Sequence, residues 1–425
     1  MCGVFGSFSP GKPIDQSSVR SALATLAHRG PNGKDFWMSQ SADAALGHTR
    51  LSIIDLQGGR QPIANEDNTI FIVVNGELYQ HEEIRKDLEL RGHVFRTRSD
   101  SEIALHLYEE YGLDFVSYLR GEFAIVLFDT NINELIAVRD RFGIKPLCYH
   151  VDQAGIVVAS EAKAIFKTGL KAEWDYEAYH HALCFQYLPT NRTLFKGVAQ
   201  VEPGEVLRFN GSQLKKFKYW DMNYPTEDAL NPIAEEEARE ELRRILTESV
   251  ALRLRADVDI CCHLSGGLDS SVIAGIITKL SGKAANCFTV SFTDASYDEL
   301  SFAEETAQFL GASLTKVEVA HADMLENLES ACYFSEGLAI NGHYSAKYLL
   351  NRSIQSSGYK VALSGEGADE VLLGYPHQRH ELDYLAEDCL QSNSLSDGIM
   401  LAGREQSDVA VFKDIFGYTP NFAQA

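Results

Sequence analysis

The pattern of hydrophobic positions differs between the two halves of the chain. Over roughly the first 210 residues, short runs rich in Val, Ile, Leu and Phe end in Gly, Asn or Asp, which is typical of strands joined by turns. Residues 101–112 depart from this pattern, because apolar residues recur there at helical spacing. The strands expected in this half are residues 69–79, 121–129, 134–143 and 155–165. Many strands with few intervening helices predict an α+β or sandwich architecture.

The second half alternates strands with helices. The strands expected there are residues 259–264, 285–292, 316–320 and the start of 360–370, and the helices are 235–258, 271–280, 298–312 and 345–358. Such alternation predicts a parallel α/β sheet. A polar, turn-rich stretch separates the two patterns, so we predict a first domain over residues 2–210, a linker over 211–234 and a second domain over 235–425.

Charge and cysteine content narrow the class of protein. The 425 residues carry a formal net charge of −22, which argues against a nucleic-acid or anionic-membrane partner because the long-range field repels phosphates. No apolar run approaches the ~18–20 residues of a membrane span, and no secretory leader is recognisable. The eight cysteines show no C-x-x-C pair, so we expect reduced thiols, no cysteine-based zinc site and a cytoplasmic enzyme.

Cys2 follows the initiator methionine directly. Removal of Met1 would leave a thiol and a free α-amine on one residue. Their pKa values lie near ~8.5 and ~7.7–8.0, so at neutral pH the amine could serve as a base for the thiol. The alternative is a buried cysteine at the start of a first strand, and this fragment alone favours that alternative.

A glycine-rich loop, SGGLDSS, occupies residues 265–271 between an expected strand and an expected helix. Gly266 and Gly267 allow several N–H groups to point into one concavity, and the helix amino terminus adds partial positive charge. Together they predict a phosphate site, with Asp269 available to Mg²⁺. Hydroxyl donors come from Ser265, Ser270 and Ser271. A tight glycine turn is the alternative, and the pattern is not a Walker A loop.

A second loop, SGEGADE, occupies residues 364–370 after another apolar run. Glu366, Asp369 and Glu370 lie within five residues, and so much negative charge is unfavourable without a cation or a proton-transfer task. The loop is therefore a candidate for Mg²⁺ coordination or for a base near a nucleotide. A solvated acidic turn is an equally good interpretation.

Taken together, the ordered motifs resemble the glutamine-dependent asparagine synthetases, from Cys2 to roughly Tyr375. The motifs are MCGVFG, HRGPNG, HTRLSIIDL, NGELYQH, SDSE, GEFAIVLFD and RDRFGIKPLCY in the first half, and HLSGGLDSS, FTVSF, YDELSFAEETAQ and LSGEGADE in the second. The resemblance implies an α+β amino-terminal-nucleophile hydrolase sandwich (αββα), followed by an α/β parallel-sheet ATP-pyrophosphatase domain.

For the first domain, the resemblance implies a glutaminase. Cys2 would be the nucleophile, attacking the side-chain amide of glutamine to give a thioester and ammonia. The side-chain amide of Asn75 and the backbone N–H of Gly76 would stabilise the oxyanion. Arg50 would bind the α-carboxylate of glutamine, and Asp100, with Glu77 nearby, its α-ammonium group. The implied glutamine contacts are Arg50, Ile53, Asn75, Gly76, Glu77 and Asp100.

For the second domain, the resemblance implies an ATP site with Mg²⁺, at which an acceptor carboxylate is adenylated and then attacked by ammonia that arrives through an internal tunnel. The implied ATP contacts are His263, Ser265, Gly266, Gly267, Asp269, Ser270, Ser271, Val290, Ser364 and Gly365. Glu366 is the implied catalytic carboxylate, and Asp269 and Asp369 are the implied metal ligands.

The activity implied is synthesis of asparagine from aspartate and glutamine, releasing AMP and pyrophosphate. A related amidotransferase acting on another carboxylate is the first alternative, and a glutaminase-only or non-catalytic subunit is the second. Relatives continue into a helical segment with a lysine that this sequence lacks before Ala425, so we expect a truncated, split or degenerate synthetase. A homodimer or a complementary synthetase subunit is the expected assembly.

Overall fold

The computed structural model describes residues 1–224, 233–294, 298–339 and 341–375, and its contacts divide the chain into two units. The first unit comprises Met1–Cys261, Val290–Asp298 and Lys316–Ala362. The second comprises Cys262–Thr289, Glu299–Thr315 and Leu363–Ala425, the last described as far as residue 375.

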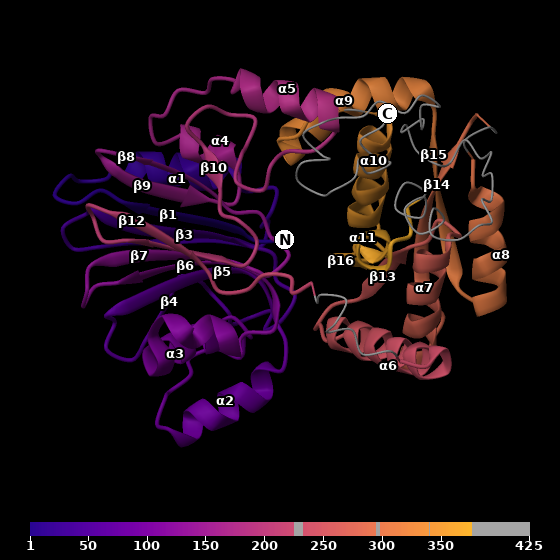
Figure 1. Ribbon diagram of the computed structural model, residues 1–425, viewed down its shortest axis with the longest axis horizontal. Coiled ribbons are helices and arrows are strands. Elements are labelled where there is room, and N and C mark those ends of the chain that lie inside the picture. Colours follow the sequence, from indigo (N-terminus) through magenta and orange to yellow (C-terminus); the bar gives the residue numbers. More distant parts are fainter. Residues whose placement is uncertain (225–232, 295–297, 340, 376–425) are drawn as a thin grey trace. The chain divides into compact units, whose positions relative to one another are not determined.

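Two six-stranded antiparallel sheets form the centre of the first unit (Figure 1). One sheet has the order β10-β8-β9-β1-β3-β2, with β1 Gly3–Phe8, β2 Gly33–Met38, β3 Ala44–Arg50, β8 Cys148–Asp152, β9 Gly155–Ala159 and β10 Ala199–Gln200. The other has the order β12-β11-β7-β6-β5-β4, with β4 Ile63–Ala64, β5 Ile70–Leu78, β6 Gly121–Asp129, β7 Glu134–Arg139, β11 Glu205–Phe209 and β12 Leu214–Lys218.

Helices cover both sheets, which makes four layers. Val4 and Phe8 of β1 point into the core between the sheets, whereas Phe5 packs toward α1 (Gln16–Thr25) and α4 (Ala162–Phe166). On the far side, a third core joins β5 and β6 to α3 (Glu102–Tyr111), beside α2 (His81–Leu90). The predicted αββα sandwich is therefore confirmed.

A four-stranded sheet with the order β15-β14-β13-β16 follows. Its strands are β13 Ile260–His263, β14 Asn286–Phe292, β15 Ser313–Val319 and β16 Val361–Leu363. The helices of this part are α6 Glu235–Arg253, α7 Leu268–Ser281, α8 Leu300–Leu310, α9 His321–Ser335, α10 His343–Ser356 and α11 Ala368–Leu372. β13 and β14 pair in parallel, with His263 opposite Phe288, as the alternation of strands and helices predicted.

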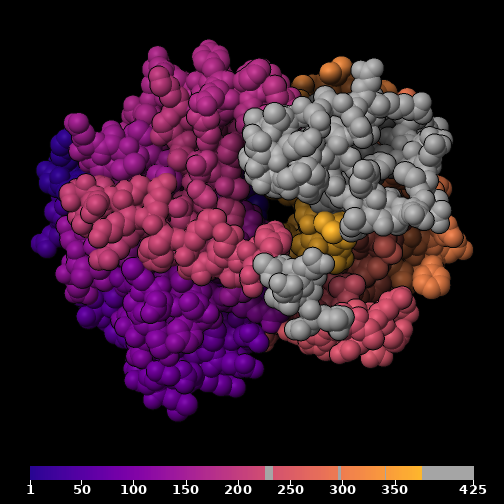
Figure 2. Space-filling view, in the orientation of Figure 1, coloured from indigo at the N-terminus to yellow at the C-terminus, as the bar shows by residue number. Residues whose placement is uncertain are grey.

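Three local features add to the sequence interpretation. The strand expected over residues 155–165 ends at Ala159, and α4 begins at Ala162, because its short segment of good helix formers packs against α1 instead of continuing the sheet. β12 lies within the segment expected to be a linker. It is an edge strand of its sheet, its residues are largely exposed, and it lies on the visible face of the first unit (Figure 2). Among the described helices, none has both the length and the apolarity that a bilayer span requires.

Candidate active sites

Cys2 lies immediately before β1, next to the end of β3. Its Sγ accepts a hydrogen bond of 3.3 Å from the N–H of Leu51. Arg29 fixes the backbone of the same residue, because its Nε donates to the Cys2 carbonyl over 2.9 Å while its Nη1 pairs with Glu161 at 2.7 Å. Burial raises the pKa of the Cys2 thiol, and the Leu51 hydrogen bond and the Arg50 charge oppose that rise. The sulfur is thus held in one orientation by the backbone around it.

A pocket in the first unit is built around this sulfur. Its lining residues are Met1, Cys2, Arg50, Leu51, Ile53, Ile54, Gly59, Gln61, Val74, Asn75, Gly76, Glu77, Ser99, Asp100, Ser101 and Lys145. Every residue that the resemblance assigned to the glutaminase lies in this lining. The structure therefore brings together positions that are up to 98 residues apart in sequence, between Cys2 and Asp100.

The two expected oxyanion donors lie side by side on β5. The Nδ2 of Asn75 is buried and has no hydrogen-bond partner among the described residues, so it can donate to a group that enters the pocket. Gly76 lies where β5 and β6 approach closely, since a Cβ there would come within 2.3 Å of the Glu122 carbonyl oxygen. A side chain at position 76 would push the strands apart and move the Asn75 amide.

Arg50 ends β3 and points into the loop that follows it. Its guanidinium donates to the carbonyl oxygens of Gly58 at 2.7 Å and Ile54 at 3.2 Å. These partners are uncharged, so they orient the guanidinium without neutralising it. An oriented cation of this kind fits a carboxylate on a ligand.

Glu77 and Asp100 form an acidic pair in the same pocket. The Oδ2 of Asp100 accepts the N–H of Leu78 at 2.7 Å, and its Oδ1 accepts the Ser99 hydroxyl at 3.2 Å. Burial raises the pKa of Asp100, and burial together with the Asp100 charge raises the pKa of Glu77. A bound ammonium group would relieve this repulsion, which is the electrostatic signature of a site for a cationic ligand group.

Lys145 and Gln61 line the pocket but were not singled out from the sequence. Lys145 Nζ pairs with Glu122 at 3.0 Å, and its charge lowers the pKa of Glu77 against the effect of burial. Gln61 bonds the backbone of Val74 through both ends of its amide. Lys145 lies within the motif RDRFGIKPLCY, and membership of that motif was the only feature of the sequence that could have indicated a role for it.

In the second unit, the glycine-rich loop joins β13 to α7. Gly266 has a φ of +86°, and a Cβ there would come within 2.4 Å of the Phe302 carbonyl carbon, so only glycine fits. The Ser270 hydroxyl lies 3.0 Å from that of Ser265 and accepts the Ser265 N–H at 3.2 Å. The serines thus hold the loop in shape at the amino terminus of α7, as expected of an anion site.

The acidic loop lies against the same helix end. A Cβ on Gly365 would come within 2.8 Å of the Asp269 Cβ, which shows how closely the two loops approach. Burial and the charge of Asp369 raise the pKa of Asp269, so the two carboxylates lie close enough to repel each other. Oxygen donors of this kind fit Mg²⁺. Ser364 and Glu366 belong to the same loop. Ser364 is partly exposed, and Glu366 is exposed.

The remaining two expected nucleotide contacts lie on the neighbouring strands. His263 ends β13, and Val290 lies two residues beyond its opposite partner on β14. The division of the chain assigns Val290 to the first unit and His263 to the second. Their roles stay predictions.

Comparison with known proteins matches each half of the chain to a protein family. Residues 1–220 match the family described as glutamine amidotransferase domain, and residues 241–411 match the family described as asparagine synthase. "Amidase chyE" of Penicillium rubens is 39% identical over 410 residues, covering 90% of this chain and 60% of that protein. "Amidase chry2" of Gibberella zeae is 38% identical over 375 residues, covering 84% and 55%.

An asparagine synthetase is similar over the same extent. "Asparagine synthetase [glutamine-hydrolyzing] 1" of Bacillus subtilis is 34% identical over 391 residues, covering 90% of this chain and 60% of that protein. The chain thus spans a little over half the length of these relatives. With both domain families matched in this order, the chain belongs to the glutamine-hydrolysing asparagine synthetase family.

Proposed function

We propose that this chain hydrolyses glutamine at Cys2 and supplies the ammonia to a carboxylate that the second site activates with ATP. The observation that carries the proposal is a pocket lined both by Cys2, whose sulfur is held by the Leu51 N–H, and by Asn75, whose amide donor is unpaired. Arg50 and the Glu77–Asp100 pair supply the two opposite charges that the α-carboxylate and α-ammonium groups of glutamine require.

The first step needs the amine of Cys2, so we propose that Met1 is removed. Burial lowers the pKa of the Met1 amine to about 5, with the charges of Arg29 and Lys145 adding to the effect, and the same surroundings would favour an unprotonated amine on Cys2. After removal, the Cys2 amine takes the thiol proton while the sulfur attacks the glutamine side-chain carbonyl carbon. The C–S bond forms and the carbonyl electron pair moves to oxygen.

The tetrahedral oxyanion then collapses. Asn75 Nδ2 and the Gly76 N–H stabilise the oxyanion by hydrogen bonds that strengthen as its charge develops. The C–N bond breaks as the Cys2 ammonium returns its proton to the leaving nitrogen, releasing ammonia and leaving a thioester. Water, deprotonated by the same amine, attacks the thioester and frees glutamate and the thiol.

The second site is proposed to bind ATP at the glycine-rich loop. The N–H groups of that loop and the hydroxyls of Ser265 and Ser270 would contact the phosphates. Asp269 and Asp369 would hold Mg²⁺, which when bound neutralises phosphate charge. The acceptor carboxylate attacks the α-phosphorus and displaces pyrophosphate; ammonia then displaces AMP to give the amide. Glu366 is placed in the same loop as a candidate base.

Aspartate is the proposed acceptor, which would make the product asparagine. A different carboxylate is the second candidate, because two relatives at 38% and 39% identity carry the name amidase, whereas the asparagine synthetase above is 34% identical. ATP–pyrophosphate exchange separates the two: stimulation by aspartate supports the first, and stimulation only by other carboxylic acids supports the second. We also propose a cytoplasmic location, where ATP is available, with a homodimer or a complementary synthetase subunit as partner.

Glutamate release from glutamine tests the first half of the proposal. Cys2→Ala is expected to abolish release while leaving thermal unfolding unchanged. Cys184→Ala is the matched control, because that thiol is exposed and lies outside the pocket lining, and it is expected to retain the wild-type rate. Equal rates for Cys2→Ala and wild type would overturn the assignment of the nucleophile.

A further inference from the structure

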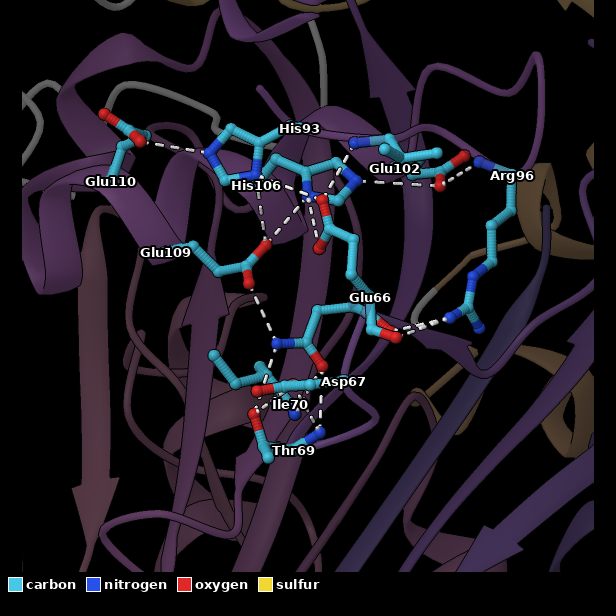
Figure 3. Close-up of polar contacts among 12 residues, drawn as sticks. Glu66, Asp67, Thr69, Ile70, His93, Arg96, Glu102, His106, Glu109 and Glu110 are labelled. Atoms are coloured by element: carbon cyan, nitrogen blue, oxygen red, sulfur yellow. Dashed lines mark hydrogen bonds and ion pairs between the residues drawn. The ribbon is translucent and has the colours of Figure 1, made fainter. Parts of the chain in front are cut away.

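A cluster of two histidines and two glutamates lies in the first unit, outside the residues that line the pocket (Figure 3). Glu66 is in the turn between β4 and β5, His93 is in the loop after α2, and His106 and Glu109 lie one turn apart on α3. One ligand atom from each of the four lies within 4.8 Å of all the others. We call these four residues the His–Glu cluster.

The spacing of these atoms is close to that of a metal coordination shell. His93 Nδ1 lies 3.4 Å from Glu66 Oε1 and 3.6 Å from Glu109 Oε2. His106 Nδ1 lies 3.7 Å from Glu66 Oε2 and 2.8 Å from Glu109 Oε2. With bonds of about 2.0–2.1 Å, neighbouring ligands of a tetrahedral zinc ion lie roughly 3.3–3.4 Å apart. Small side-chain rotations would therefore complete a tetrahedron.

The far nitrogen of each histidine faces a further carboxylate. His106 Nε2 lies 3.7 Å from Glu102 Oε1, and His93 Nε2 lies 3.1 Å from Glu110 Oε1. A carboxylate behind each imidazole is the arrangement that fixes the ring and its tautomer in metal sites, so that Nδ1 presents its lone pair to the ion. His93 has this support as a hydrogen bond to Glu110, whereas the buried Nε2 of His106 faces Glu102 beyond hydrogen-bond distance.

The two glutamates are also held in place. Glu66 Oε1 accepts the N–H of Val94 at 2.8 Å, and Glu109 Oε1 accepts the side-chain amide of Asn65 at 2.8 Å. Glu109 Oε2 faces both histidines, Glu66 Oε2 faces His106, and Glu66 Oε1 faces His93 while it accepts the Val94 N–H. His106 is fully buried, whereas Glu66 is exposed, so an ion could enter from the side of Glu66.

We propose that the His–Glu cluster binds one Zn²⁺ ion through His93, His106, Glu66 and Glu109. Two imidazole nitrogens with two carboxylate oxygens are a donor set suited to zinc, and the two carboxylates balance its charge. The ion joins three segments that are distant in sequence: the β4–β5 turn, the loop after α2, and α3. The same loop continues to Ser99, Asp100 and Ser101, which line the pocket, so the site is a structural support for that wall.

Zinc titration of the full chain tests this site. His93→Gln removes a ligand that is less buried than His106, so the variant is expected to fold, with an unfolding temperature in chelator equal to that of wild type. His150→Gln is the matched control, because His150 contacts Gly197 and Asp152, away from the cluster. Each variant is also made in a Cys2→Ala background, which removes zinc binding by the pocket thiol.

Wild type and His150→Gln are expected to bind one more equivalent of Zn²⁺ than His93→Gln, and Glu109→Gln is expected to lose the same equivalent. Co²⁺ in place of zinc is expected to give the intense visible absorption of a tetrahedral site in wild type and His150→Gln, and not in His93→Gln or Glu109→Gln. Identical stoichiometry in wild type and His93→Gln, with no such absorption, would overturn the proposal and identify the cluster as a proton-linked ion-pair network. Neither outcome depends on glutaminase activity.

Discussion

Two buried carboxamides in one pocket provide a sharp test of the oxyanion assignment. Gln61 is satisfied: its Nε2 donates to the Val74 carbonyl at 3.2 Å and the Ser101 hydroxyl at 3.3 Å, and its Oε1 accepts the Val74 N–H at 2.6 Å. Asn75 Nδ2 has no such partner among the described residues, although it is buried. Replacing each by alanine should therefore have opposite consequences for stability and catalysis.

The magnitudes follow from these contacts. An unsatisfied buried donor costs about 1–3 kcal/mol, so Asn75→Ala relieves a penalty that offsets the packing it loses, and the free energy of unfolding should change by less than about 1 kcal/mol. An oxyanion donor contributes about 2.7–4 kcal/mol to the transition state, so kcat should fall ~10²–10³-fold. Gln61→Ala removes three hydrogen bonds worth about 0.5–1.5 kcal/mol each, so unfolding should become easier by roughly 1.5–4.5 kcal/mol.

The assay combines steady-state glutamate release with urea unfolding of the same preparations. Asn75→Ala is expected to lower kcat with little change in KM or in the urea midpoint. Gln61→Ala is expected to lower the urea midpoint and to reduce kcat by less than about tenfold, well short of the loss of an oxyanion donor. A kcat for Asn75→Ala within threefold of wild type, or a larger loss of stability than Gln61→Ala shows, would refute the reasoning.

Two further predictions concern the acidic pair and the glycine-rich loop. Because burial and Asp100 raise the pKa of Glu77 to about 8, the native state retains a proton that the unfolded chain releases near its ordinary value of 4.5, so wild-type stability should fall as pH rises between those values. Glu77→Gln should flatten that fall in unfolding temperature against pH, and an equally steep fall in the variant would contradict the pKa assignment. Gly266→Ala forces a side chain onto a φ of +86° and to within 2.4 Å of the Phe302 backbone, so it should abolish ATP binding while glutamate release persists. Unchanged ATP affinity by calorimetry would show that the loop does not hold the nucleotide.

The hydrophobic pattern predicted those helices and strands whose conformation is determined by their own residues. Residues 121–129 contain a continuous apolar run and form β6 over that same range, and the helical spacing of residues 101–112 gives α3. Residues 155–165 were misjudged because α4 is set by packing against α1, which local pattern does not contain.

The pocket and the His–Glu cluster could not be predicted from the local sequence pattern, because both are formed by residues from distant parts of the sequence. β1 places Cys2 beside the end of β3, and β5 places Asn75 on the facing sheet; no spacing in the sequence shows that these meet, and only the family resemblance indicated it. That Asn75 Nδ2 has no hydrogen-bond partner among the described residues could be seen only from the side-chain positions in the structure. The His–Glu cluster gave no signal, since its ligands are distributed between residues 66 and 109.

Covalent trapping by a glutamine analogue with an electrophilic diazoketone tests the central claim most directly. The account predicts that the mature chain begins at Cys2 and that peptide mass spectrometry finds one adduct, on the sulfur of that first residue, which excess glutamine prevents. A chain that retains Met1 while it releases glutamate, or an adduct on any other residue, would contradict it.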